Sequence, residues 1–341
     1  TNWLGENTLT YSKTFNKDHS LNVVAGFTAE ASDYFNNNSS GKGFDIESLG
    51  YWNMGLANSS LLSVASGGNH SAIASWLGRV NYAYKGKYLA SVSFRADGSS
   101  KFAKNNKWGY FPSAALGWRI SEEDFMKDIS WIQNLKLRAS YGETGSQAIT
   151  AYQSLASFST TSYVLNGSSA VALVPGRVPN PDLKWEVKHT FNTGIDLAMF
   201  GNRLLLSANY YNSKTTDMLY LYNVSVPPFT YNTLLANIGS MRNSGLEIAI
   251  GITPLKTQDM ELNINANITF QQNKLLSLSG MYNGELISAP EYKSLASLDG
   301  AGFHGGYNHI VYQVVGQPLG VFYLPRANGL VSDGNGGYTY D

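Results

Sequence analysis

The sequence predicts an all-β protein, and within that class an antiparallel transmembrane β-barrel. Three observations carry this prediction. Long segments alternate apolar and polar residues, as strands with two different faces do, and charge gathers in one of the two rows. The turns at one end of these segments are short and the connections at the other end are long, as in known membrane barrels. Charged residues make up only 14% of the 341 residues, against about 25% in average soluble domains.

The clearest pair of strands lies between Trp76 and Asp97. One row of this hairpin is apolar and aromatic, whereas the other carries Arg79, Asn81 and Arg95. A membrane-spanning strand needs about 9–11 residues at a tilt of roughly 40°, and each half of the hairpin has that length. Aromatic residues stand beside the turn, where an interfacial girdle is expected: Tyr82, Tyr84 and Tyr88.

The remaining strands are predicted in order along the chain. A first pair, 8–15 and 20–30, precedes the hairpin. After it, alternation predicts strands at 110–120, 135–141, 185–199, 203–214, 246–252 and 262–270, with weaker candidates at 310–315 and 321–324. The connection 121–134 begins with Ser-Glu-Glu-Asp, a capping-type start that predicts one short helix. Together these segments predict about ten or more strands.

Long connections are predicted at about 36–68, 142–183 and 216–238, on the side that faces outside the cell. No segment approaches 18 consecutive apolar residues, so a transmembrane helix is not expected. The chain begins without Met and ends in a Gly-rich turn. We therefore expect residues 1–341 to form a partial barrel that is incomplete at both ends.

The polar row is the candidate lining of a lumen. Arg or Lys on the lipid face costs about 2–4 kcal/mol at the midplane of the bilayer, so the row that carries charge is expected to face inward. Contact with a plug or hydration of the interior is the favoured role, and direct substrate contact is the alternative. The candidates are Arg79, Asn81, Arg95, Arg119, Arg138, Lys188, Asn192, Asn263 and Asn265.

Aromatic residues in the long connections form a second candidate set. Such rings stack on sugar faces, but they equally pack loops together or against a partner, and the sequence favours packing. The set comprises Tyr51, Trp52, Tyr152, Tyr163 and Tyr231.

Enzyme activity is not expected, and no catalytic, cofactor or metal site is predicted. The five histidines lack the tight spacing of zinc sites, and no serine lies in a recognisable nucleophile motif. The formal net charge of zero argues against nucleic-acid binding, which usually needs a basic face. Cysteine is absent, which an outer-membrane location permits and a cytosolic one does not exclude.

An ordered set of motifs resembles the SusC/RagA family of TonB-dependent outer-membrane transporters. It starts with Gly-Arg-Val-Asn-Tyr-Ala-Tyr at 78–84 and includes Trp-Gly-Tyr-Phe-Pro-Ser at 108–113. Later members are Asn-Pro-Asp-Leu-Lys-Trp-Glu at 180–186 and Asn-Ile-Gly-Ser-Met-Arg-Asn-Ser-Gly-Leu-Glu at 237–247. Further matches lie at 93–102, 117–123, 134–142 and 316–323, so the motifs cover most of residues 70–325. Each motif alone is weak, whereas their order is specific.

The resemblance implies a barrel of 22 strands with a plugged lumen, in the outer membrane of a Gram-negative bacterium. It implies TonB-dependent import of a nutrient, either a glycan or oligosaccharide or a peptide. Its partners would be a SusD-like surface lipoprotein, which acts as a lid, and TonB, contacted through a missing N-terminal part. A plug domain is not recognised in this sequence. Two alternatives stay open: a passive porin-like channel, and a soluble carbohydrate-binding or adhesin β-protein.

Overall fold

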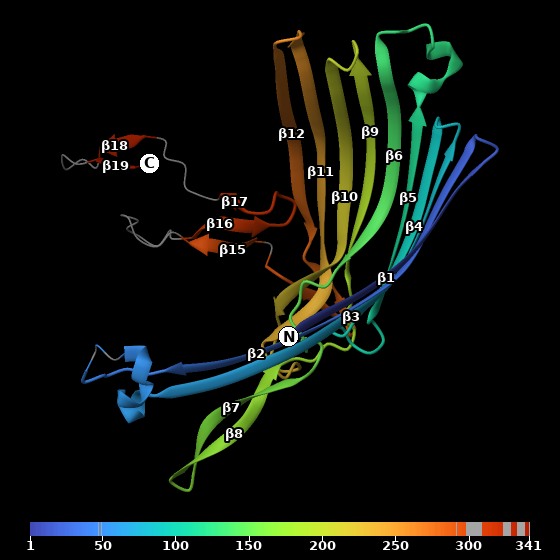
Figure 1. Ribbon diagram of the computed structural model, residues 1–341. Coiled ribbons are helices and arrows are strands. Elements are labelled where there is room, and N and C mark those ends of the chain that lie inside the picture. Colours follow the sequence, from blue (N-terminus) through green and yellow to red (C-terminus); the bar gives the residue numbers. More distant parts are fainter. Residues whose placement is uncertain are drawn as a thin grey trace.

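Ten strands form one antiparallel sheet, in the order β1-β2-β3-β4-β5-β6-β9-β10-β11-β12. The computed structural model describes residues 1–46, 48, 50–290, 292–297, 309–322, 329–332 and 338–340. The sheet is an open, curved wall (Figure 1). Its strands are β1 (Asn2–Phe15), β2 (His19–Ser40), β3 (Ser63–Tyr84), β4 (Tyr88–Ser99), β5 (Trp108–Arg119), β6 (Ile132–Ser146), β9 (Glu186–Met199), β10 (Leu204–Asn223), β11 (Thr233–Lys256) and β12 (Glu261–Ser277). This confirms the predicted all-β, antiparallel architecture.

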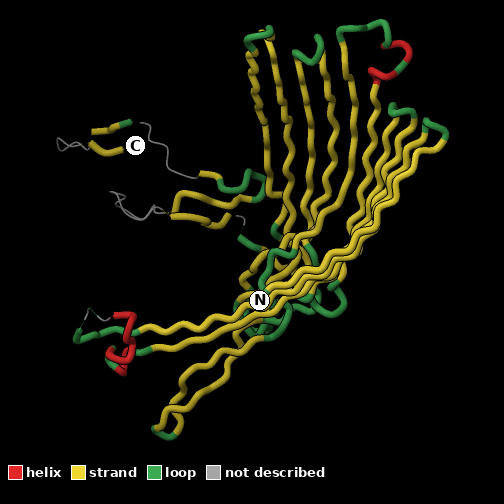
Figure 2. The backbone as a smooth tube through the Cα atoms, in the orientation of Figure 1, coloured by secondary structure: helices red, strands yellow, loops and turns green. Residues whose placement is uncertain are grey.

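The connections are sorted by length between the two ends of the wall. Residues 16–18, 85–87, 200–203 and 257–260 make brief turns at one end, which we call the short-turn end. The opposite, long-loop end carries the extended β2–β3 hairpin and a separate hairpin of β7 (Ser157–Leu165) and β8 (Ser168–Arg177). Figure 2 shows these two hairpins projecting from the wall at the end away from the short turns.

The predicted long connections are shorter in the structure than the sequence indicates. β2 and β3 pair as far as Ser40 and Ser63, so the first connection covers only 41–62. The other two shrink to 147–185, which contains β7 and β8, and to 224–232. Strands pair through their backbones, so pairing does not require alternating apolar side chains. Outside the membrane-facing part the alternation is lost, but the hydrogen bonds between the strands continue.

The short helix predicted within 121–134 is wrong. The structure has two single 3-10 turns there, Ile120–Glu122 and Asp124–Met126, and Glu123 between them is extended, with φ −76° and ψ 149°. The Ser121 hydroxyl caps nothing; it is buried without a hydrogen-bond partner among the described residues. The Glu123 carboxylate, inside the predicted helix start, instead binds side chains of the neighbouring strands.

Small sheets follow the main wall. β12 runs to Ser277, beyond the predicted strand end at residue 270. The segments after it are β13 (Ser279–Tyr282) with β14 (Glu285–Ser288), β15 (Tyr292–Ser297) with β16 (His309–Val314) and β17 (Val321–Phe322), and β18 (Leu330–Ser332) with β19 (Tyr338–Tyr340). The two weaker strand candidates coincide with β16 and β17, although residues 323–324 lie outside the described residues. Within the described ranges, no helix is long and apolar enough to cross a membrane.

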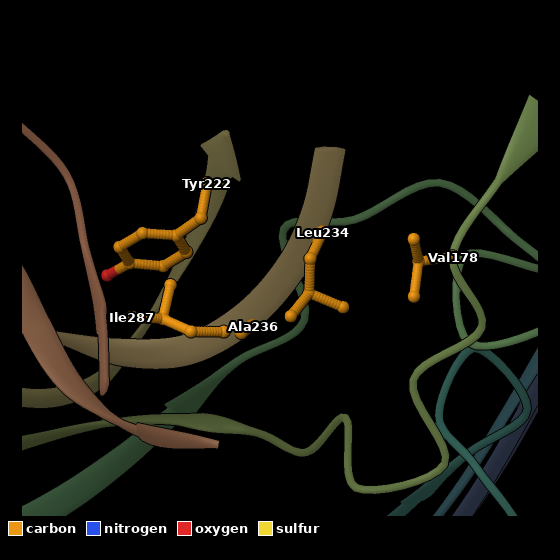
Figure 3. Close-up of a cluster of buried hydrophobic side chains, with 5 residues drawn as sticks. All are labelled: Val178, Tyr222, Leu234, Ala236 and Ile287. Atoms are coloured by element: carbon orange, nitrogen blue, oxygen red, sulfur yellow. The ribbon is translucent and has the colours of Figure 1, made fainter. Parts of the chain in front are cut away.

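The buried core lies at the long-loop end rather than inside the wall. One cluster comprises Val178, Tyr222, Leu234, Ala236 and Ile287, from the segment after β8, the ends of β10 and β11, and β14 (Figure 3). A second comprises Phe102, Phe111, Leu183 and Trp185. By contrast, large apolar residues in the middle of the wall are exposed, as a lipid-facing surface requires.

Candidate functional site

The strand register places all nine candidate lumen residues on one face of the sheet. Residues that pair directly across strands share a face. The ladder that starts at Asn81 on β3 reaches Asn192 on β9 through Ser91, Ala115 and Ser140. By the same reading, Arg79, Arg95, Arg119, Arg138, Lys188, Asn263 and Asn265 fall on this side, which we call the polar face. That it lines a lumen stays a prediction.

The opposite side, which we call the apolar face, carries a continuous row of mostly apolar side chains. One ladder across eight strands reads Tyr82, Ala90, Leu116, Ala139, Thr193, Tyr210, Leu246 and Phe270. Aromatic pairs bound this face at both ends: Trp76 lies 4.5 Å from Phe27 towards the long-loop end, and Tyr84 lies 4.9 Å from His19 at the short-turn end. Tyr84 lies eight residues beyond Trp76, which is a rise of about 20 Å at a tilt of roughly 40°. The spacing suits two interfacial girdles.

Arg138 organises the polar face near the short-turn end. Its Nε donates to Asp196 Oδ2 at 3.1 Å, and its Nη1 donates to Asn209 Oδ1 at 3.1 Å. Ser207 Oγ donates to Asp196 Oδ1 at 2.8 Å. The network therefore links β6, β9 and β10 through side chains alone. Because the charges are matched by hydrogen bonds, this part of the face is suited to hydration rather than to capture of a ligand.

Two further candidates also take part in cross-strand polar contacts. Arg95 Nε lies 2.6 Å from Asp97 Oδ1, and Arg95 Nη2 donates to the fully buried Ser75 Oγ at 3.0 Å. Asn81 accepts from Ser91 Oγ at 2.7 Å and donates to Asn22 Oδ1 at 3.1 Å.

The remaining candidates divide into paired and unpaired groups. Arg119 pairs with Glu122 at 3.0 Å, and Asn263 accepts from Thr253 Oγ1 at 2.7 Å. Within the described ranges, four side chains have no hydrogen-bond or ion-pair partner: Arg79, Lys188, Asn192 and Asn265. A depression of about 610 Å³ is lined by Arg95, Asp97, Asn192 and neighbouring small polar residues. The unpaired cations Arg79 and Lys188 are therefore the candidates with free capacity for an anionic group.

The structure does not bring the five loop aromatics into one group. Tyr51 and Trp52 are adjacent, with ring centroids 4.9 Å apart and exposed fractions of 76% and 79%. Tyr152 instead packs towards the wall, because its hydroxyl accepts from the His70 backbone N–H at 3.1 Å. Tyr163 lies on β7 and Tyr231 on the β10–β11 connection, and no described ring contact joins them to the first pair.

Sequence reasoning missed a hydrogen-bonded centre at the short-turn end. The Glu123 carboxylate accepts from Tyr88 Oη at 2.6 Å and Trp118 Nε1 at 3.0 Å, and lies 3.0 Å from Lys87 Nζ. These contacts, led by the Tyr88 hydrogen bond, lower the pKa of Glu123 from 4.5 to about 2. The same ion pair raises the pKa of Lys87. The motif 117–123 contained Glu123, but only the fold shows its partners.

Two recognised motifs also meet at the long-loop end, which the sequence did not reveal. Asn237 Nδ2 donates to the backbone oxygens of Lys184 at 2.8 Å and Asp217 at 2.9 Å, while its Oδ1 accepts from Lys184 N–H at 2.9 Å. The buried Trp185 donates to the Lys107 oxygen at 2.9 Å. The motifs at 180–186 and 237–247 therefore fasten the loops to the wall.

Comparisons with known proteins agree with this architecture. Residues 1–341 match the family described as TonB dependent receptor-like, beta-barrel. TonB-dependent receptor P39 of Formosa agariphila is 34% identical, over 96% of this chain and 30% of that protein. TonB-dependent receptor SusC of Bacteroides thetaiotaomicron is 36% identical, over 62% of this chain and 21% of that protein. A solved structure of the RagAB peptide transporter has a TM-score of 0.78 and 23% identity, over 99% of this chain and 35% of that one.

These matches confirm the resemblance to SusC/RagA proteins and the barrel fold. The chain spans about 30% of the length of the curated relatives it matches. The family is one of receptors and transporters rather than enzymes. The chain belongs to the TonB-dependent receptor-like β-barrel family, whose members lie in the outer membrane of Gram-negative bacteria.

Proposed function

We propose that this chain forms part of the barrel wall and loops of a transporter. The transporter imports a nutrient across the outer membrane with energy supplied through TonB. The observation that carries the proposal is the division of the sheet into two faces. One face is apolar and exposed, and the other holds charged residues in cross-strand hydrogen bonds. Such a wall separates lipid from water, because charge on the lipid side is costly.

The polar face supports a hydrated route past an interior plug. In the network around Arg138, the positive charge is balanced by Asp196, so this polar surface can be hydrated without a large net charge. Arg79 and Lys188 are the cations that would contact a plug or an anionic cargo group. Asn192, on the same strand as Lys188, lines two neighbouring depressions of this face.

The cargo is proposed to be an oligosaccharide or a peptide, and a SusD-like surface lipoprotein is proposed to cover the long-loop end. The solved structure named as the RagAB peptide transporter supports a peptide, and the resemblance of the motifs to the SusC/RagA family implies an oligosaccharide as the other class. Tyr51 and Trp52, adjacent and exposed on the β2–β3 hairpin, are suited to contact a partner or a sugar ring.

The test measures uptake in cells that carry the complete protein. Radiolabelled defined oligosaccharides and defined peptides are offered separately, with and without a protonophore that abolishes the energy source of TonB. Active import predicts accumulation of at least one probe class that ends when the protonophore is added. Uptake that continues unchanged at the same rate contradicts this proposal and favours the passive-channel alternative.

A further inference from the structure

Three cations form a row across neighbouring strands on the apolar face. Lys214 on β10 pairs directly with Arg242 on β11, and Arg242 pairs directly with Lys274 on β12. Neighbouring strands lie about 4.8 Å apart, so three positive charges stand within about 10 Å. We call these three residues the cationic row.

The positive charges of the cationic row are not neutralised by nearby carboxylates of the described residues. All three residues are exposed, and in the part of the chain that the structure describes none has a carboxylate within 4.0 Å. The next residue along the ladder, His189, pairs with Glu143 at 3.1 Å, so that carboxylate is already engaged. Like charges directly opposite one another destabilise a sheet. A bound anion would remove this repulsion.

The rows beneath the cations change in polarity step by step. Directly below lie the uncharged polar residues Asn212, Ser244 and Gln272, and below these lie Tyr210, Leu246 and Phe270, then Ala208, Ile248 and Ile268. Each step is two residues along the strand, which is about 5 Å of height at a tilt of roughly 40°. The order from apolar to polar to cationic matches the order of acyl chain, neutral headgroup region and headgroup anion in a lipid.

The height of the row places it at the edge of a membrane. Lys214 lies ten residues beyond Leu204, where β10 begins at the short-turn end. Ten residues at that tilt rise about 25 Å, which is the height of the apolar band of an outer-membrane barrel. At the other edge of these strands, Lys256 pairs with Glu261 at 3.3 Å. On this face of β10–β12 the uncompensated cations are therefore at the long-loop side of the band.

We infer that the cationic row binds the phosphate of a lipid headgroup in the outer leaflet of the membrane. Lys and Arg donate charge-assisted hydrogen bonds to phosphate oxygens, and the amide and hydroxyl row below offers further donors to the neutral part of the headgroup. The site fastens lipid to the outside of β10–β12, where the β10–β11 hairpin continues beyond the row to Asn223 and Thr233. The inference rests on the membrane orientation in the proposed function, but not on transport.

The experiment titrates the complete protein in detergent micelles with fluorescent bis-phosphorylated lipid A, and with the same lipid after its phosphates are removed. The variant Lys214→Gln/Arg242→Gln/Lys274→Gln is compared with Lys42→Gln/Lys104→Gln/Lys136→Gln, which removes three cations that lie outside the cationic row. Each cation near an anionic membrane surface contributes about fivefold in affinity. We expect the first variant to lose roughly 100-fold in affinity for the phosphorylated lipid, and the second to bind as the unmodified protein does.

Four results would overturn the inference: equal binding by the unmodified protein and the first variant, equal losses in both variants, the same loss with the dephosphorylated lipid, or displacement of lipid by inorganic phosphate alone. Heat-modified gel mobility confirms that each variant is folded. If the triple variant does not fold, Arg242→Gln alone must lose about fivefold, and Lys214→Arg/Lys274→Arg must retain affinity. Import is not needed for this measurement, so its outcome is independent of the uptake test.

Discussion

At the scale of single residues, Glu123 lies in a segment that the sequence predicts to start a helix, but its carboxylate binds side chains of the sheet. It lies after β5 and binds Tyr88 on β4, Trp118 on β5 and Lys87 in the turn between β3 and β4. The charged form is favoured because all three partners donate to it. A residue that looked like part of a helix start is therefore the centre of the short-turn rim.

The lowered pKa of Glu123 makes this rim sensitive to acid. The folded-state pKa is about 2, below the ordinary value of 4.5, so the stabilisation is complete above pH 4.5 and is lost as pH falls towards 2. We expect the urea midpoint of the complete protein in micelles to fall across this window, and to fall less in Glu123→Gln. Asp259→Asn, at an exposed turn position, should behave as the unmodified protein does; an identical acid response in all three would contradict the assignment.

Two adjacent residues of β4, Val92 and Ser93, lie on opposite faces of the sheet and can be compared directly. Val92 is 58% exposed on the apolar face, and Ser93 is on the polar face, where its hydroxyl lies 2.6 Å from that of Ser113. Val92→Arg should cost about 2–4 kcal/mol of insertion free energy, whereas Ser93→Arg should cost much less. Folding yield into lipid vesicles, read from heat-modified gel mobility, measures both. Equal losses would show that the face assignment is wrong.

At the scale of elements, the loops are held by buried aromatic residues rather than by long regular structure. Phe111 and Trp185 pack edge to face with centroids 5.6 Å apart. Gly145 on β6 lies against the same ring, so that a methyl group there would overlap Phe111. The long-loop end therefore depends on close packing of one strand end against two motifs.

The close contact between Gly145 and Phe111 can be tested by comparing alanine substitutions at Gly145 and at an uncrowded glycine. Gly145→Ala forces Phe111 or its strand to move, and overpacking of this kind typically costs about 1–3 kcal/mol. Gly78→Ala is the control, because nothing lies within 4 Å of the added methyl group. We expect faster proteolysis of the 147–185 connection in Gly145→Ala only, measured as the half-life of the complete protein under limited digestion. Equal half-lives for the two variants would contradict the packing described for Phe111.

At the scale of the whole molecule, the wall has two unpaired edges. Among the described strands, β1 pairs only with β2, and β12 pairs only with β11. In a bilayer each unsatisfied backbone group costs several kcal/mol. The sheet is therefore stable in a membrane only as part of a closed barrel.

Expression of the 341 residues alone tests this conclusion. We expect aggregation, or association through the β1 and β12 edges, because exposed edges recruit further strands. Size-exclusion chromatography with light scattering, in buffer and in detergent, measures the result. A sharp monomeric peak in either condition would show that the edges are satisfied within this chain.

The sequence by itself determined the strands, their two faces and the family, since alternation with a period of two residues is a local property that survives without tertiary information. That period predicts that Arg79, Arg138 and Asn192 each lie opposite the apolar row of their own strand. Only the tertiary structure decided the partners: Asp196 for Arg138, Tyr88 for Glu123, and the row formed by Lys214, Arg242 and Lys274. The physical reason is that register joins residues far apart in the chain, and hydrogen bonds between strands continue where apolar alternation has ended.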